Sequence, residues 1–209
     1  MDAHLFRSAI GQVVFAAATE ETRPVLTGIK LEIAEGQFTL AGADGFRLAV
    51  FTVLGRQFMN LKVDCPYRTA DRMLSELEGK ADGVIAEIHA EATSEKIAMG
   101  WHLDGQVTAV VGTHTHVQSA DERVLPAGTA YITDVGMTGP HDSVIGVDKQ
   151  VVLKRFLTGM PGRFDTASGD PRLNGVIVTA DADTGRATGI ERLSLTSADI
   201  EAMARETTT

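Results

Sequence analysis

The sequence predicts an α/β protein, α+β overall, in which a helix and an antiparallel hairpin precede the alternating part of the chain. Two observations support this prediction. Residues 83–112 read as a buried strand, a helix and a second buried strand, which is the alternation of an α/β layer. Residues 29–53 alternate apolar and polar side chains across two turn signals, “EG” and “DG”, which predicts three antiparallel strands.

The first element is expected to be a helix over residues 3–18, because apolar side chains recur there at the spacing of one helical face. The residues on that face are Phe6, Ile10, Val13, Val14 and Ala17. The sequence “ETRPVLTG” then ends the helix, since proline cannot continue it. The helix is expected to pack on the antiparallel strands that follow, because the apolar faces of the two elements match.

The α/β part is expected to begin with a short helix at residues 73–77 that Gly79 ends. The sequence “GVIAEI” reads as a buried strand and “QVTAVVG” as a second one. The helix between them is expected to turn Ile97, Ala98 and Trp101 to one face. Further on, “TAYITDVG” reads as a strand and “GVIVTADADTGRATGIERL” as a hairpin, whereas the tail “ARETTT” is expected to fray.

At 209 residues the chain is long enough for one domain or two small ones, at roughly 100–200 residues per domain. Its formal net charge of −9 disfavours nucleic acids and anionic membranes as partners, because both are attracted by positive fields. The single cysteine, Cys65, excludes an internal disulfide and a cysteine-based zinc site. The sequence has no run of about 20 apolar residues and no signal-peptide pattern, so the chain is expected to be cytoplasmic.

Two histidines stand two residues apart in “AVVGTHTHVQSAD”, at the end of an apolar run. Side chains at i and i+2 of an extended strand point to the same face, so His114 and His116 are expected to converge on one site. His89 also follows a buried strand, where open α/β sheets place their ligand sites. The spacing alone favours a solvated turn, and for His102 and His141 a structural role is the stronger interpretation.

The most distinctive sequences in the chain, which are the least expected by chance, are “HAEATSEK”, “VVGTHTHVQ” and “GTAYITDVGMTGP”. Through them, residues 48–193 closely resemble the YmdB-type branch of the calcineurin-like metallophosphoesterases. The resemblance implies two β-sheets flanked by helices, with two divalent metal ions between the sheets; iron, manganese and zinc are the candidates. It also implies hydrolysis of cyclic nucleotide phosphodiesters, with His89, His114 and His116 as metal ligands.

The chain departs from that family in its amino-terminal part. The family has “GD”, “GEN” and “GNH” segments there, which supply acidic and asparagine ligands and the catalytic histidine, and residues 1–60 contain none of them. The three histidines are therefore expected to form a partial site that binds at most one divalent ion, weakly. No spacing argument brings Asp104, Asp121 or Asp134 to this site, and the catalytic residues are unknown.

The sequences “TRPVLTG” and “DGFRLAV” carry a second resemblance, to the middle domain of the bacterial DNA polymerase III sliding clamp. It implies a chimera, in which a clamp-like helix and hairpin at residues 1–50 precede a partial metallophosphoesterase sandwich at residues 51–209. In the clamp family, five matching positions help line the groove that receives partner peptides: Arg23, Leu26, Gly45, Arg47 and Leu48. The alternative for these five is ordinary hairpin structure, with the glycine in a turn, the leucines in the core and the arginines at the surface.

Three functions remain as alternatives. The first is a metal-dependent phosphodiesterase that acts on a small phosphodiester such as a cyclic nucleotide, with low turnover because the amino-terminal ligands are absent. The second is a binding module in which the clamp-like hairpin recruits replication partners. The third is an inactive fusion product whose unpaired sheet edges associate into homo-oligomers.

Overall fold

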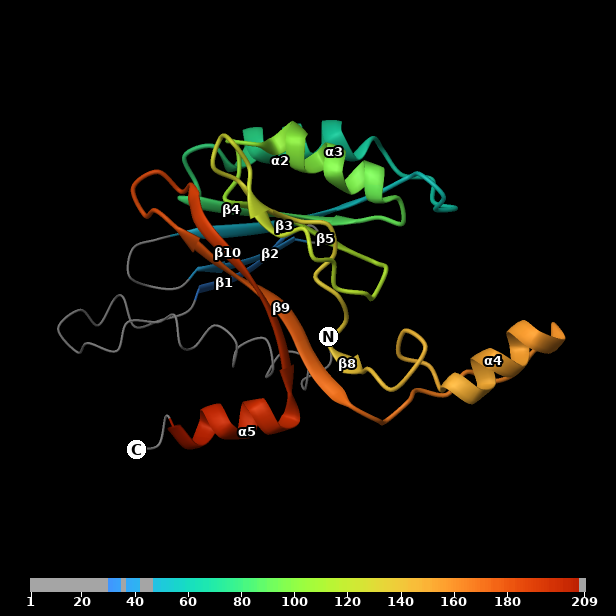
Figure 1. Cartoon of the computed structure of the whole chain (residues 1–209). Helices are drawn as coiled ribbons and strands as arrows, with labels where there is room; N and C mark the ends of the chain where they lie inside the picture. The colour runs from blue at the N-terminus through green and yellow to red at the C-terminus, as the bar shows by residue number, and fades with distance from the viewer. Residues whose placement is uncertain (1–29, 35–36, 42–46, 207–209) are drawn as a thin grey trace.

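The computed structural model of the chain describes residues 30–34, 37–41 and 47–206, and most of them form three layers (Figure 1). The central layer is a five-stranded sheet in the order β3-β4-β5-β7-β6. Its strands are β3 (Leu48–Leu54), β4 (Gly83–His89), β5 (Ala109–Thr113), β6 (Arg123–Val124) and β7 (Ala130–Ile132). Strands β3, β4, β5 and β7 are parallel, and β6 is antiparallel to β7 at one edge. The predicted α/β class is confirmed.

Two helices cover one face of this sheet: α2 (Pro66–Leu77) and α3 (Thr93–Leu103). Each connects one parallel strand to the next, as the alternating pattern predicts. The main hydrophobic core fills the space between the helices and the sheet, and its buried members include Phe51, Ile88, Met99, Leu103 and Tyr131. This packing fixes the strand ends at which the histidines lie.

The buried face of α3 is not the face that was predicted. Its buried residues are Glu95, Lys96, Met99, Gly100 and Leu103. The predicted apolar face is wrong, because Ala98 and Trp101 are exposed and Ile97 is only partly buried. The reason is Lys96, a charged residue that lies inside the buried stripe because it pairs with a buried acid, Asp134.

A second sheet covers the other face of the central sheet (Figure 1). Its strands, in the antiparallel order β10-β9-β8, are β8 (Gly139–Pro140), β9 (Pro171–Ala180) and β10 (Ala187–Thr196). A second, smaller core between the two sheets contains the buried Ala109, Ala130 and Ala187. The hairpin predicted between β9 and β10 is confirmed, and its turn is closed by hydrogen bonds from Thr184 to the Asp181 carboxylate.

The antiparallel prediction for residues 29–53 is confirmed in part and wrong in part. Strands β1 (Lys30–Ala34) and β2 (Gln37–Ala41) pair antiparallel, as predicted. Strand β3, by contrast, pairs in parallel with β4, in a register that starts with Leu48 opposite Gly83. The crossover through α2 sets both strands in the same direction, so β3 belongs to the α/β layer.

Helix α4 (Lys149–Thr158) was not predicted, and it projects away from the two sheets (Figure 1). The carboxylate of Asp148 accepts hydrogen bonds from the amides of Gln150 and Val151, at 2.9 and 3.2 Å, and so satisfies donors that have no partner inside the helix. Gly159 ends the helix in the left-handed conformation, with a φ of 67°. These two caps are the local signals from which the helix could have been found.

Helix α5 (Ser197–Glu206) begins where β10 ends. The amide and hydroxyl of Thr196 donate to the Asp199 carboxylate, and the Asp199 amide donates back to the Thr196 hydroxyl, which is a reciprocal helix cap. The expected fraying of the tail is wrong for residues 204–206, which complete the helix, and residues 207–209 lie outside the described residues. None of the helices in the described part of the chain is long and apolar enough to cross a membrane.

Several predicted features lie outside the described residues: the helix at residues 3–18 and the groove positions Arg23, Leu26 and Gly45. The other two groove positions are used within the fold. The guanidinium of Arg47 donates twice to the Asp82 carboxylate, at 3.1 Å each, and Leu48 begins β3. The domain boundary predicted after residue 50 falls inside β3 and stays a prediction.

Candidate functional site

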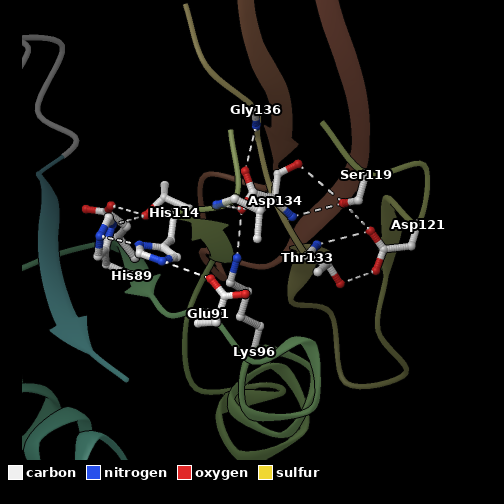
Figure 2. A network of polar contacts seen from close by, with 12 residues as sticks. His89, Glu91, Lys96, His114, Ser119, Asp121, Thr133, Asp134 and Gly136 are labelled. Atoms are coloured by element: carbon white, nitrogen blue, oxygen red, sulfur yellow. Dashed lines mark hydrogen bonds and ion pairs between the residues drawn. The ribbon is translucent and has the colours of Figure 1, made fainter. Parts of the chain in front are cut away.

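Two of the predicted histidines meet at the carboxyl ends of neighbouring parallel strands. His89 is the last residue of β4, and His114 directly follows β5, whose Thr113 lies opposite His89. The Nε2 atom of His89 and the Nδ1 atom of His114 are 3.0 Å apart, and the two rings are nearly perpendicular (Figure 2). The pair therefore occupies the sheet edge at which open α/β sheets bind their ligands.

A relay of hydrogen bonds fixes the tautomer of the His89 ring. Glu87 accepts from the hydroxyls of Thr52 and Thr113, at 2.6 and 2.7 Å. Because the Thr113 hydroxyl donates its hydrogen bond to Glu87, its oxygen accepts a hydrogen bond from the Nδ1–H of His89 at 2.9 Å. The lone pair of the neutral ring then lies on Nε2, which faces Nδ1 of His114 at hydrogen-bonding distance, so an ion between the two rings would take the place of that contact. Metal-binding histidines are oriented in this way, by a partner on the other ring nitrogen.

His114 is held from its other side by an acid that was not predicted from the sequence. Its Nε2 atom is 3.0 Å from a carboxylate oxygen of Glu91, whose side chain is 51% exposed. A carboxylate only accepts hydrogen bonds, so this nitrogen carries a proton when the contact forms. The signal for Glu91 was its place in “HAEATSEK”, two residues after the strand-end histidine. Glu91 therefore orients the ring of His114 from the side opposite His89.

The backbone at residues 114–117 is a bend and not the extended strand that was predicted. Strand β5 ends at Thr113, and His114 and His116 have φ values of 105° and 67°, which bulky residues adopt only when their surroundings enforce it. The Nδ1–H of His116 donates to the carbonyl oxygen of Ile145 at 3.0 Å, and His116 does not take part in the contact between His89 and His114. The extended strand on which the shared face was predicted is therefore wrong, and the convergence of His114 and His116 on one site stays a prediction.

This bend is anchored by Asp134, a buried acid. Its Oδ2 atom accepts from the amide and the hydroxyl of Thr115, at 3.0 and 2.7 Å, between the two histidines. The same oxygen is 2.7 Å from Nζ of Lys96, whose side chain is 0% exposed (Figure 2). Burial alone would raise the pKa of Asp134, but hydrogen bonds from Lys96, Thr115 and Gly136 hold that pKa below its usual value.

This ion pair was not predicted from the sequence either. Lys96 lies on the buried stripe of α3, and Asp134 follows β7 after one further residue. Charged residues are almost never fully buried unless they are paired, so two charges within apolar segments were a signal for a partner. Asp104 and Asp121 accept hydrogen bonds from loop backbone instead and do not touch the histidine pair.

The two histidines that were interpreted as structural do have structural contacts. His102, near the end of α3, has its Nε2 atom 2.7 Å from the Asp71 carboxylate on α2 and so links the two helices. His141 donates from Nδ1 to the carbonyl oxygen of Gly139 at 3.0 Å, and its Nε2 atom accepts from the Asn174 amide at 3.1 Å. Neither ring contacts His89 or His114.

Among the described residues, no three His, Cys, Asp or Glu side chains are grouped so as to hold one metal ion. The donor chemistry nevertheless fits an ion, because imidazole nitrogens suit zinc and iron and the His89 lone pair on Nε2 points to the site. His116 lines a pocket of about 320 Å³ with His141 and Asn174. The structure thus brings together two of the three predicted ligands, with Glu91 beside them.

The YmdB-like protein family matches this chain over residues 23–193. The 2',3'-cyclic-nucleotide 2'-phosphodiesterase of Bacillus subtilis (strain 168) is 49% identical to it over 155 residues, which cover 74% of this chain and 58% of that protein. Two putative phosphatases/phosphodiesterases of Mycoplasma species are matched over 52% and 62% of their lengths. The chain therefore spans between half and two thirds of the length of these relatives.

A shorter segment resembles a different protein. Over 46 residues the chain is 48% identical to the beta sliding clamp of Halalkalibacterium halodurans, which amounts to 22% of this chain and 12% of the clamp. The YmdB-like match starts at residue 23 and so overlaps the segment 1–50 that was attributed to a clamp. The predicted chimera is therefore not confirmed.

Two solved structures share the fold, each with a TM-score of 0.66. A hypothetical protein from Thermus thermophilus is 41% identical, and the match covers 81% of this chain and 62% of that one. A phosphatase from Mycoplasma pneumoniae is 33% identical, with 81% and 57% covered. Because the family match covers most of the sequence and the fold agrees, the chain belongs to the YmdB-like protein family.

Proposed function

We propose that the chain carries the histidine half of a phosphodiesterase site, which uses a divalent metal ion and acts on small phosphodiesters such as cyclic nucleotides. The observation that carries this proposal is the contact of His89 with His114 at two parallel strand ends, with the His89 lone pair fixed on Nε2. The similarity to a 2',3'-cyclic-nucleotide 2'-phosphodiesterase supports the class of substrate.

The residues around the pair have distinct roles in this proposal. His89 and His114 would hold the ion through Nε2 and Nδ1, and Glu91, which contacts the opposite nitrogen of His114, would orient that ring. A bound divalent ion supplies a Lewis acid for the phosphoryl oxygens and an activated water. Thr113 and Glu87 keep the Nδ1 atom of His89 protonated, so that its other nitrogen stays available.

His116 is the third proposed ligand, on the strength of the family resemblance. Its Nδ1–H donates to the carbonyl oxygen of Ile145, so Nε2 is the ring nitrogen that would bind an ion. We therefore propose at most one ion, weakly held and partly occupied, because this donor set has no acid placed to bridge two ions. Zinc or iron suits it better than manganese, which prefers more oxygen ligands. Slow turnover follows.

The proposal predicts slow, metal-dependent hydrolysis of bis(p-nitrophenyl) phosphate and of a 2',3'-cyclic nucleotide. His114→Ala should lower the rate by about tenfold or more, since even the loss of a residue that supports a metal ligand costs about 10–100-fold. His102→Ala is the matched control, because that imidazole contacts Asp71 on α2 and should leave the rate unchanged. Equal rates in the wild type, in His114→Ala and in chelator-treated protein would contradict the proposal.

We also propose that residues 1–50 share their origin with the middle domain of a sliding clamp, ahead of a second unit at residues 51–209. The 48% identity over 46 residues supports this origin. We assign the segment no clamp function, because the match is 12% of a clamp and the groove position Arg47 is bound to Asp82. The formal net charge of −9 also disfavours a DNA partner.

A further inference from the structure

The projecting helix α4 carries an apolar stripe on its surface. Leu153, Phe156 and Leu157 follow one another at helical spacing and are 49%, 77% and 84% exposed, and Met160, just beyond the helix end at Gly159, is 64% exposed. Val152, on another side of the helix, is 6% exposed, so α4 has one packed side and one bare apolar side. Large contiguous apolar patches on soluble proteins mark sites of interaction.

The same segment is basic, although the chain as a whole is acidic. Residues 149–164 contain four basic residues and no acidic one, whereas the formal net charge of the chain is −9. Lys149 pairs with Asp142 at the base of the projection. Lys154 forms no ion pair with any residue that the structure describes. The stripe therefore fits a partner surface that is acidic and partly apolar.

Helix α5 has this combination of properties. Residues 197–206 contain three acidic residues, Asp199, Glu201 and Glu206, and one basic residue. Ile200 and Met203 lie one turn apart on the helix and are 43% and 54% exposed. In Figure 1, α4 and α5 lie on opposite sides of the hairpin formed by β9 and β10, so the two helices are far apart within one chain.

We propose that α4 of one copy of the chain packs on α5 of a second copy, and that a two-fold axis repeats the contact. The apolar stripe of α4 would cover Ile200 and Met203, while Lys154 faces Glu201, an exposed acid that Arg205 of its own helix contacts at 3.4 Å. Such a reciprocal contact is closed, so it produces a dimer and not a filament. This dimer is independent of the proposed catalytic function, and it uses helices instead of the open sheet edges.

Sedimentation velocity on the whole chain in about 0.1 M salt tests the contact, since charge attraction at a surface is not strongly screened there. The wild type should be a dimer, and Phe156→Glu should raise its dissociation constant about 30-fold or more, as for a central interface residue. Phe58→Glu is the matched control, because Phe58 is 89% exposed and lies outside both helices, and it should remain dimeric. A monomeric wild type, or equal behaviour of the two variants, would overturn the proposal.

Variants that reverse the charge of one residue on each helix test whether α5 is the surface on which α4 packs. Lys154→Glu and Glu201→Lys should each weaken the dimer by about two- to fivefold, the range of an exposed ion pair, and their combination should recover wild-type affinity. Circular dichroism would check that the helices remain folded in each variant. Losses that simply add in the combined variant would exclude α5 as the partner surface. A chain that stays monomeric but sediments with anionic vesicles through Phe156 would show a membrane surface as the partner and overturn the proposal.

Discussion

Lys96→Met should lower the free energy of unfolding by about 3–5 kcal/mol, because it leaves the buried carboxylate of Asp134 without its cation. The lysine side chain is 0% exposed and the aspartate side chain 2% exposed, so water cannot replace the lost partner. Methionine fills a similar volume, so the loss reports on charge more than on packing. Urea unfolding measures it, and Lys80→Met at an exposed lysine is the control, expected within about 0.5 kcal/mol of the wild type.

A second variant, and unfolding measurements at several pH values, separate the effect of the unpaired charge on stability from the effect of packing. Adding Asp134→Asn to Lys96→Met should restore part of the stability, because no unpaired charge then stays buried. The pKa of Asp134 is depressed in the folded protein, so the ion pair stabilises fully above the ordinary aspartate value of about 3.9 and less as the pH falls through the folded value. The gap between the wild type and Lys96→Met should therefore narrow in acid. A constant gap, or a double variant no more stable than Lys96→Met, would contradict this account.

Gly112→Ala should cost about 3 kcal/mol or more, or prevent folding, because the added Cβ would overlap the backbone carbonyl of Thr133. It would also lie 2.9 Å from Cδ of Lys96. The clash is with backbone, so β5 and β7 must separate to relieve it, and this movement displaces Thr115 from Asp134. Urea unfolding and the yield of folded protein measure the effect.

Gly175→Ala is the matched control for that substitution. Gly175 lies in β9, where an added Cβ would meet no atom within 4 Å. The change should be neutral or stabilise slightly, by about 0.4–1 kcal/mol, because alanine restricts the unfolded chain. Similar losses in both variants would mean that the close approach of β5 to β7 does not limit the fold.

The α/β layer could be predicted from the sequence because its signals are local. The apolar runs “GVIAEI” and “QVTAVVG” and the glycines Gly79 and Gly105 lie at strands and helix ends of the structure. The direction of β3 could not be predicted in this way, because alternation describes which face is buried and not which strand is the neighbour. The orientation of α3 was missed for a related reason, since a lysine reads as polar until its distant partner is known.

The candidate site, like the fold, could be predicted from the sequence only in part. The placement of His89 and His114 at neighbouring strand ends follows from strand order, which a strand-helix-strand pattern predicts. The bend at residues 114–117 could not be predicted from those residues alone, because the contact that holds it joins Thr115 to an acid 19 positions later. Glu91 was within reach of prediction, since it lies in one of the most specific sequences of the chain.

The content of divalent metal per chain is the most direct test of the histidine half-site. Protein dialysed against zinc and then against metal-free buffer would be measured by elemental analysis, together with His89→Ala and, as the control, His102→Ala. We predict no more than one zinc ion per chain for the wild type and for His102→Ala, and a background level for His89→Ala, because the Nε2 atom of His89 holds the available lone pair. Close to two ions per chain, or the same content in His89→Ala as in the wild type, would contradict the account.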